Sequence, residues 1–151
     1  MSVRTFRVTT RYSGRKRAVK VKVYDELSAL RRAADAWTFR HGLEQPGHFG
    51  SAMGVCHAFD SVFVPDDGGE EIRGEAAALI RLWRGALGTG VVVHEVTHAA
   101  SAIYQQDWEP DHGAVSDGMD NEEVLCYLVG DLTRRIVDRL YHYDMYSEKA
   151  S

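Results

Sequence analysis

The segment TGVVVHEVTHAASAIYQQ, residues 89–106, places two histidines and a glutamate in an otherwise apolar, small-residue run. Its composition predicts a buried helix from about residue 88 to residue 106. On a helix, side chains four residues apart lie on one face, so His94 and His98 can converge on a single ion. Burying the carboxylate of Glu95 between them without a partner would cost several kcal/mol, and a dication removes that cost. A metal site therefore explains this segment better than the alternative, in which the two histidines are hydrogen-bonded core residues without a metal.

The five residues HEVTH match the HExxH pattern, in which both histidines bind zinc and the glutamate acts on a metal-bound water. We therefore predict Zn2+ as the cofactor, His94 and His98 as two of its ligands and Glu95 as the catalytic base. A catalytic zinc site usually has three protein ligands and a fourth position for water. The longer pattern HExxHxxGxxH is absent, since Gln105 and Gln106 occupy the region where a third histidine would be sought.

The segment DNEEVLCYLVGDLTRRI, residues 120–136, offers two carboxylates at the start of the last predicted helix. An HExxH motif followed by a glutamate on a later helix resembles the gluzincin class of zinc metallopeptidases. The compact arrangement of VVHEVTHAAS and then EEVLCYLVGDL resembles small phage-type HExxH proteins and, more distantly, ImmA/IrrE-type peptidases. The resemblance extends over about residues 77–137. It implies a minimal zincin-like domain in which a glutamate is the third zinc ligand.

Two glutamates compete for the place of the third ligand. In the resembled families a small residue, commonly Ala, follows the ligand glutamate after three positions and lets the two helices approach. Cys126, and Gly130 one turn later, stand in this relation to Glu123, whereas Leu125 follows Glu122. The resemblance therefore favours Glu123 as the metal ligand. The apolar face of the same helix lies nearer to Glu122, which keeps that residue as the alternative.

The sequence does not rank the residues that could stabilise the transition state. His112 lies in the acidic loop between the two metal-binding helices, and it is one candidate for polarising a substrate oxygen. Tyr104 and Tyr127 are two others. The remaining histidines are scattered and are each better explained as surface or hydrogen-bonded residues: His41, His48, His57 and His142.

Alternating residues at the N-terminus indicate a β-hairpin, with strands over residues 6–12 and 17–24 joined by the turn SGRK. Residues 26–40 follow with one apolar stripe, which is typical of an amphipathic helix. Asp25 is placed to cap the start of that helix.

A run rich in β-branched and aromatic residues predicts a third strand over residues 55–64. Residues 77–83 fit a strand or a helix, and we choose a strand, because that arrangement is usual before the HExxH helix in the resembled class. A final helix over residues 121–143 places leucines and an isoleucine on one face. Together these elements predict an α+β fold, with a small twisted sheet packed on three helices that include the HExxH helix.

Charge is unevenly distributed along the chain. Residues 1–40 contain eleven Lys or Arg and three acidic residues, so the remainder is strongly acidic in a chain of net charge −4. A basic arm of this kind can attract nucleic acid. However, no aromatic interleaving or recognised nucleic-acid motif accompanies it. We therefore interpret these cations as solvent-facing hairpin residues that discourage edge-to-edge pairing, and we do not expect nucleic acid as a partner.

Length and composition indicate one globular domain over residues 1–151. No apolar run approaches the roughly 20 residues that a spanning helix needs, and the alternating N-terminus does not resemble a signal peptide. We therefore expect a cytoplasmic protein with no membrane partner. Cys56 and Cys126 lie in apolar contexts far apart in sequence, which favours buried, reduced thiols over a disulfide.

These observations lead to one main hypothesis and two alternatives. The main hypothesis is a zinc metallopeptidase that hydrolyses a peptide or protein substrate, with His94, His98 and Glu123 holding the metal and Glu95 transferring protons. The first alternative is a zinc-stabilised binding module that kept the ligands and lost turnover. The second is a nucleic-acid-binding accessory protein that uses the basic hairpin.

Overall fold

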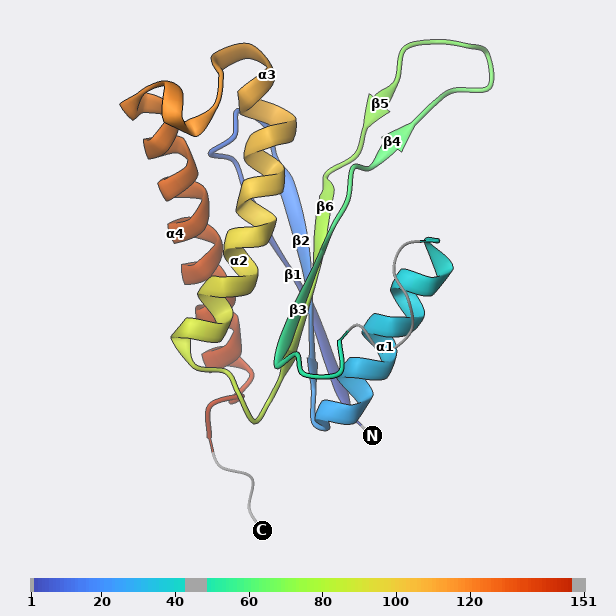
Figure 1. Cartoon of the computed structure of the whole chain (residues 1–151), viewed down its shortest axis with the longest axis vertical. Coiled ribbons are helices and arrows are strands. Elements are labelled where there is room, and N and C mark those ends of the chain that lie inside the picture. Colours follow the sequence, from blue (N-terminus) through green and yellow to red (C-terminus); the bar gives the residue numbers. More distant parts are fainter. Residues whose placement is uncertain (1, 43–48, 148–151) are drawn as a thin grey trace.

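A four-stranded sheet with helices on both faces forms the body of the protein in the computed structural model, which describes residues 2–42 and 49–147 (Figure 1). The strands are β1 (Val3–Thr10), β2 (Arg17–Tyr24), β3 (Gly54–Ala58), β4 (Val62–Phe63), β5 (Ile72–Arg73) and β6 (Ala76–Trp83). The helices are α1 (Leu27–Arg40), α2 (Thr89–Ile103), a π-helical turn (Tyr104–Trp108), α3 (Glu109–His112), a 3-10 turn (Val115–Asp117) and α4 (Met119–His142). This mixture agrees with the α+β class predicted from the sequence.

The sheet has the strand order β1-β2-β6-β3. β1 runs antiparallel to β2, β2 runs parallel to β6, and β6 runs antiparallel to β3. The predicted hairpin and the predicted strand over residues 77–83 are therefore both confirmed. Because β3 and β1 are the outer strands, each of them has one edge that no other strand of this sheet covers.

Helices α2 and α4 pack against one face of the sheet. Alternate residues of the β1–β2 hairpin supply the apolar side chains on that face. Phe6 and Val8 of β1 and Val19, Val21 and Val23 of β2 are buried in that layer. The intervening side chains point to the opposite face of the sheet, where part of the surface is exposed.

Helix α4 contributes a buried stripe with the spacing of an α-helix. Leu128, Leu132, Ile136 and Leu140 have no exposed surface, whereas Leu125 at the start of the stripe is half-buried. Full burial of a side chain of this size stabilises a fold by about 1.5–3 kcal/mol. The stripe therefore fixes which face of α4 is turned to the core, and it leaves the first turn of the helix near the surface.

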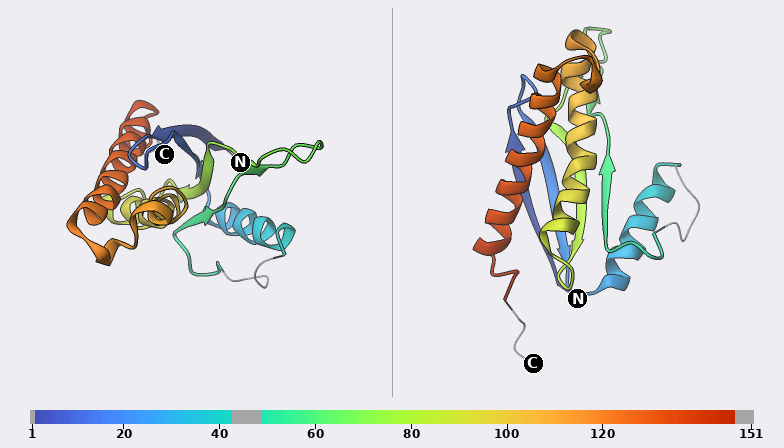
Figure 2. Two further views of the ribbon diagram at one scale, coloured as in Figure 1. Left: turned by 90° about the horizontal axis from the view of Figure 1, so that it is seen from above. Right: turned by 60° about the vertical axis from the view of Figure 1, so that its left-hand side comes forward.

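Helix α1 covers the other face of the sheet (Figure 2). Its Leu30 and Ala34 are buried against Tyr24 and Val55. The predicted cap is wrong, because Glu26 and not Asp25 occupies the position before the first turn.

The predicted third strand over residues 55–64 is divided in two. β3 ends at Ala58, and β4 pairs with β5 in a separate two-stranded sheet, a hairpin that projects from the body (Figure 1). The loop between β4 and β5 contains the PDDGG sequence, in which Gly68 has a φ of 76° that favours glycine. The short strand β5 that follows this turn was not predicted from the sequence.

Two further expectations concern the helices and the cysteines. The predicted helix over residues 88–106 is α2 followed by the wider π-helical turn. Cys56 is half-buried and Cys126 is exposed, and both are free thiols, so the expectation of burial is wrong for Cys126. In the described part of the chain no helix combines the length and the apolar character needed to cross a membrane.

Candidate metal site on helix α2

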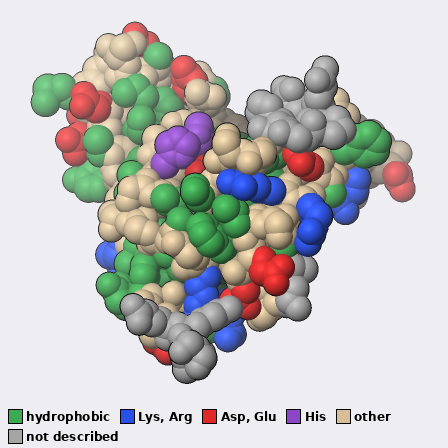
Figure 3. Space-filling model, turned by 60° about the horizontal axis from the view of Figure 1, so that its bottom comes forward, with side chains coloured by type: hydrophobic (Ala, Val, Ile, Leu, Met, Phe, Trp, Pro, Cys, Tyr) green, Lys and Arg blue, Asp and Glu red, His purple; other side chains and the backbone are tan. Residues whose placement is uncertain are grey.

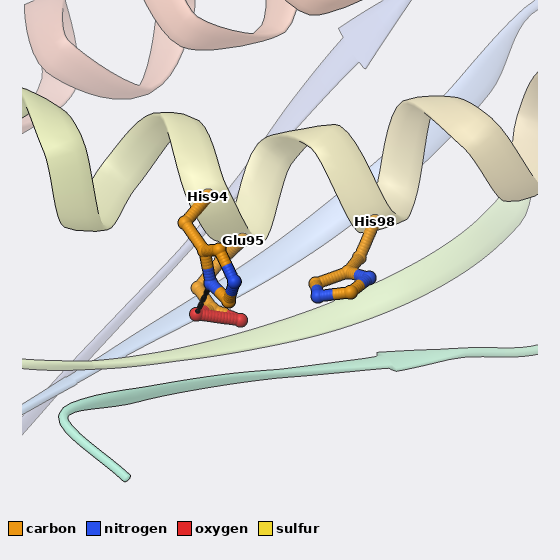
Figure 4. Close-up of side chains that lie close together, drawn as sticks. All are labelled: His94, Glu95 and His98. Carbon is orange, nitrogen blue, oxygen red and sulfur yellow. Dashed lines mark hydrogen bonds and ion pairs between the residues drawn. The ribbon is translucent and has the colours of Figure 1, made fainter.

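The three polar residues of the HEVTH segment lie together in space. His94, Glu95 and His98 each offer one ligand atom, and these atoms all lie within 4.8 Å of one another. The two imidazole rings have their centroids 5.0 Å apart and are almost perpendicular. All three side chains project from α2 on the side that faces β3 (Figure 4). Helical spacing therefore brings the two histidines together, as the sequence predicted.

Burial separates the roles of the three side chains. The side chain of Glu95 is 5% exposed and that of His94 is 70% exposed. The Nδ1 atom of His94 lies 2.9 Å from Oε2 of Glu95. A neutral His94 that donates from Nδ1 to this carboxylate keeps the lone pair of Nε2 free for a metal. The contact with the buried carboxylate thus leaves Nε2 of His94 as the nitrogen that can serve as a ligand.

A hollow of about 450 Å³ opens beside these residues. It is bounded by the first part of α2 and by the chain that enters β3, through Ala52, Met53, Gly54, Gly90, Val91, His94 and Glu95. Figure 3 views the molecule from the end at which α2 begins, and histidine side chains reach the surface there. A substrate can therefore reach the imidazoles from solvent.

Strand β3 supplies two site residues that the sequence analysis did not single out. Gly54 and Cys56 alternate with Val55, and they face α2, where Glu95 lies against Gly54. Burial raises the pKa of the Cys56 thiol to about 12, and the neighbouring Glu95 adds to this effect. Cys56 is therefore a neutral thiol at physiological pH. The period-2 alternation of GVCHA was the available signal for a shared face.

The predicted third ligand lies elsewhere. Glu123 and the alternative Glu122 are exposed residues in the first two turns of α4, and neither belongs to the group of His94, Glu95 and His98. Helix α2 lies between α4 and β3, and the histidines point toward β3 (Figures 2 and 4). The structure thus brings two of the three predicted ligands together, and Glu123 is not among the residues grouped with them.

Asn121 explains why the start of α4 is held away from the histidines. Its Oδ1 atom accepts a hydrogen bond from the indole of Trp108, and its Nδ2 atom donates to the carbonyls of His112 and Ala114. Trp108 follows His98 by ten residues, which is roughly 15 Å further along a helical path. Three hydrogen bonds therefore hold the start of α4, which carries Glu122 and Glu123, beside the C-terminal end of the segment from α2 to α3.

The three candidates for polarising a substrate oxygen do not join the metal site either. Tyr104 is buried, and its hydroxyl donates to the carbonyl of Gly113. Tyr127 is exposed on α4 and stacks on Tyr12. His112 stacks on Trp108. Each of these side chains thus has a local contact that accounts for its position.

Among the remaining histidines, His57 has the most specific surroundings. It is buried, it stacks on Trp37 and it accepts a hydrogen bond from Nε of Arg81 at 3.0 Å. Burial, together with Arg81 and His41, lowers its pKa to about 4. His57 is therefore neutral at physiological pH, as expected for a hydrogen-bonded core residue.

His41 and His142, the other two histidines that the structure describes, do not belong to the group of His94, Glu95 and His98. His41 and His142 are exposed, and His41 stacks on the other face of the Trp37 indole. His48 lies outside the described residues.

Comparison with protein families, curated proteins and solved structures found no match for this chain.

Proposed function

We propose that the protein is a zinc-dependent hydrolase of peptide bonds, in which His94 and His98 bind the metal and Glu95 is the general base. The observation that carries this proposal is the placement of a buried carboxylate between two imidazoles whose ligand atoms lie within 4.8 Å of it and of each other. Burial makes an ionised carboxylate costly, and a bound dication would offset that cost further than the contact with His94 does.

The donor set suits zinc. Neutral imidazole is among the ligands that zinc prefers, and the hydrogen bond from His94 to Glu95 is the type of contact that orients a ligating histidine. A zinc ion held here would supply Lewis-acid polarisation of a carbonyl oxygen and of water. The open hollow beside the histidines leaves room for a substrate and for solvent.

The chain's own residues would then move the protons. Glu95 takes a proton from the attacking water and returns it to the leaving amine, which makes it base and then acid in one cycle. Its low exposure favours this role, because the carboxylate is held in place by α2 and by the backbone of Gly54 and is not free to rotate in solvent. His94 steadies the carboxylate through the contact at 2.9 Å.

Completion of the ligand set is a separate question. That Glu123 is the third ligand stays a prediction from the sequence, and the placement of α4 gives it no support. Two histidines alone leave more coordination positions for water or substrate than a usual catalytic zinc site. The alternative from the sequence, a zinc-binding module without turnover, would use the same donor residues, and the experiment below separates the two.

The experiment measures zinc content and peptide hydrolysis in the same preparations. Wild-type protein, purified without chelator, should contain zinc in stoichiometric amount and cleave members of a broad peptide library. Glu95→Gln keeps the shape of the side chain and removes the base, so hydrolysis should fall by at least about 100-fold with zinc retained. A variant with His94→Ala and His98→Ala should lose both zinc and activity.

Matched controls remove the same chemical groups elsewhere. Glu26→Gln changes an exposed carboxylate, and a variant with His112→Ala and His142→Ala removes two exposed histidines. Both should keep zinc and activity. Zinc without any hydrolysis in the wild type would favour the binding module, and near-zero zinc in every preparation would refute both candidates.

A further inference from the structure

A two-stranded arm projects from the body of the protein on the side of the sheet away from α4 (Figure 1). We define the arm as residues 60–75, which contain β4, β5 and the loop between them. Val62, Val64 and Ile72 of the arm are 41–57% exposed. A pair of strands without a second layer is marginally stable in water, because it cannot bury such side chains by itself. The arm therefore carries apolar surface that a partner could cover.

The arm is also strongly acidic, with six acidic residues and a single cation, Arg73. Asp60 is paired with Arg73 at 3.2 Å. Glu75 is paired with Arg7 and Lys16 at the base of the arm. The outer part of the arm therefore presents negative charge beside its apolar side chains. Its four acids are exposed and form no ion pair with any residue that the structure describes: Asp66, Asp67, Glu70 and Glu71.

A groove of about 250 Å³ lies at the base of the arm, on the face of the sheet that α1 covers in part. Its walls are largely apolar and include Trp37 of α1 and Leu79 of β6. Phe59, which directly precedes the arm, and Ala76, which directly follows it, also line the groove. Pockets for small-molecule ligands usually have volumes of about 300–1,000 Å³. The smaller groove suits aliphatic side chains of a protein partner better than a small-molecule ligand.

Two lysines of β2 give this face of the sheet positive charge. Lys20 lines the groove and is exposed, and Lys22 follows on the same face of the strand. Neither of them forms an ion pair within the described part of the chain. Burial lowers the pKa of the Lys22 ammonium, and the groups that add to this effect are the cations Arg81, Lys20 and Arg40. Arg7 also lines the groove, but its charge is already paired at the base of the arm. The unpaired lysines therefore suit a partner that is both acidic and apolar.

We propose that this groove binds the arm of a second copy of the chain, and that the two copies exchange arms around a twofold axis. A twofold interface requires one surface patch that is complementary to itself. The arm and the groove form such a patch, because they are adjacent in one molecule and carry opposite charge. Val64 and Ile72 of each arm supply the apolar side chains for the other copy's groove, and the acids of the arm face its lysines. The contact uses no residue of the metal site, so it is independent of the proposed hydrolase function.

Sedimentation equilibrium of the full-length protein over a series of concentrations measures the association. The wild type should follow a monomer–dimer equilibrium. A variant with Val64→Ser and Ile72→Ser should dimerise at least about 100-fold more weakly, because both changes occur twice in a twofold pair. The matched control carries Met119→Ser and Tyr141→Ser, which remove two exposed apolar side chains from α4. This control should dimerise like the wild type.

Charge reversal tests whether the arm of one copy meets the groove of the other. An arm variant with Glu70→Lys and Glu71→Lys should dimerise at least about tenfold more weakly, because its arm and its groove then carry like charges. A groove variant with Lys20→Glu and Lys22→Glu should be weakened in the same way. An equimolar mixture of the two variants restores opposite charges at both contacts, so it should form a heterodimer about as tight as the wild-type dimer. Recovery in the mixture also shows that both variants are folded.

The proposal is overturned if the wild type stays monomeric at every concentration, or if the control on α4 weakens association as much as the arm variant does. It is also overturned if the mixture associates no better than its components. Growth into larger oligomers with concentration would show a contact that does not close around a twofold axis, and it would equally contradict the proposal. Glu95→Gln should dimerise normally, so loss of hydrolysis and loss of association remain separate results.

Discussion

A Cβ atom placed on Gly54 of β3 would lie 3.1 Å from Cγ of Glu95 and 3.2 Å from its Oε2 atom. Such contacts are tighter than a side chain normally tolerates, so the backbone of β3 and the buried carboxylate of α2 are in direct contact because position 54 has no side chain. The glycine thus sets the position of the group that we propose as the general base.

Gly54→Ala should therefore displace Glu95. The added methyl group would also lie 3.2 Å from Cγ1 of Val91, so it has little freedom to avoid both neighbours. Overpacking of this kind costs about 1–3 kcal/mol of stability, and a displacement of the base by about 1 Å can reduce turnover by as much as 100-fold. We expect peptide hydrolysis to fall by at least about tenfold while zinc content, measured on the same sample, is unchanged.

Gly90→Ala is the matched control, since Gly90 also borders the hollow and a Cβ there would meet nothing within 4 Å. This variant should keep wild-type activity. Equal losses in the two variants would show that the hollow tolerates no added methyl group at all, and the specific contact between Gly54 and Glu95 would then have no special role.

The position of α4 leads to a prediction about the third ligand. If α4 keeps its place when the metal binds, Glu123→Ala and Glu122→Ala should each change zinc affinity by less than about threefold, because neither carboxylate belongs to the group of His94, Glu95 and His98. Chelator competition on both variants measures this directly. A large loss of affinity in Glu123→Ala alone would establish the ligand expected from the resemblance. It would also require the start of α4 to leave its contacts with Trp108 on metal binding.

Most of the fold was predictable because its elements have strong periodicity. The alternation in β1 and β2 and the spacing of Leu128, Leu132 and Ile136 each leave one structure that buries the apolar residues. The pair of strands β4 and β5 was missed because two residues carry too little pattern to be distinguished from a loop. The cap at Glu26 was missed because the side chain of Asp25, one residue earlier, has the usual capping chemistry.

The candidate site was predictable where it depends on one helix and not where it depends on packing between elements. His94, Glu95 and His98 are neighbours on α2 by spacing alone. The contact of Gly54 with Glu95 and the position of Glu123 depend on how β3 and α4 pack around α2. Small residues after Glu123 favoured a close approach of two helices, but Asn121 and its hydrogen bonds decide where the first turn lies.

Arg17 and Asp107 form an ion pair at 2.6 Å in which the side chains are 0% and 2% exposed. The pair joins β2 to the π-helical turn after α2, and Arg17 also donates to Gln106 at 2.8 Å. Burial lowers the pKa of Arg17, and the attraction of Asp107 opposes that shift. Asp107→Asn should leave a buried cation without its counter-charge, which typically costs about 3–5 kcal/mol.

Urea unfolding followed by circular dichroism measures this loss. Asp138→Asn is the matched control, because Asp138 is 67% exposed and lies 3.8 Å from Arg134, and exposed pairs contribute about 1 kcal/mol or less. A loss below about 1 kcal/mol in Asp107→Asn would mean that Gln106 and the backbone carbonyl of Glu75 are sufficient partners for Arg17.

His57 should make stability depend on pH. Its pKa is about 4 in the folded protein, against the ordinary value of 6.5, because burial and then Arg81 and His41 disfavour the charged ring. Between pH 6.5 and pH 4 the unfolded chain therefore binds a proton that the folded protein does not, so the free energy of unfolding falls as pH falls through this range. The contribution is complete above pH 6.5 and amounts to at most about 3 kcal/mol.

His57→Gln keeps an acceptor for Arg81 and does not titrate, so its free energy of unfolding should change less between pH 7 and pH 4.5 than that of the wild type. Denaturant unfolding at both pH values measures the difference, with His142→Gln, which changes an exposed histidine, as the control. Identical pH dependence in His57→Gln and the wild type would show that other groups cause the acid destabilisation.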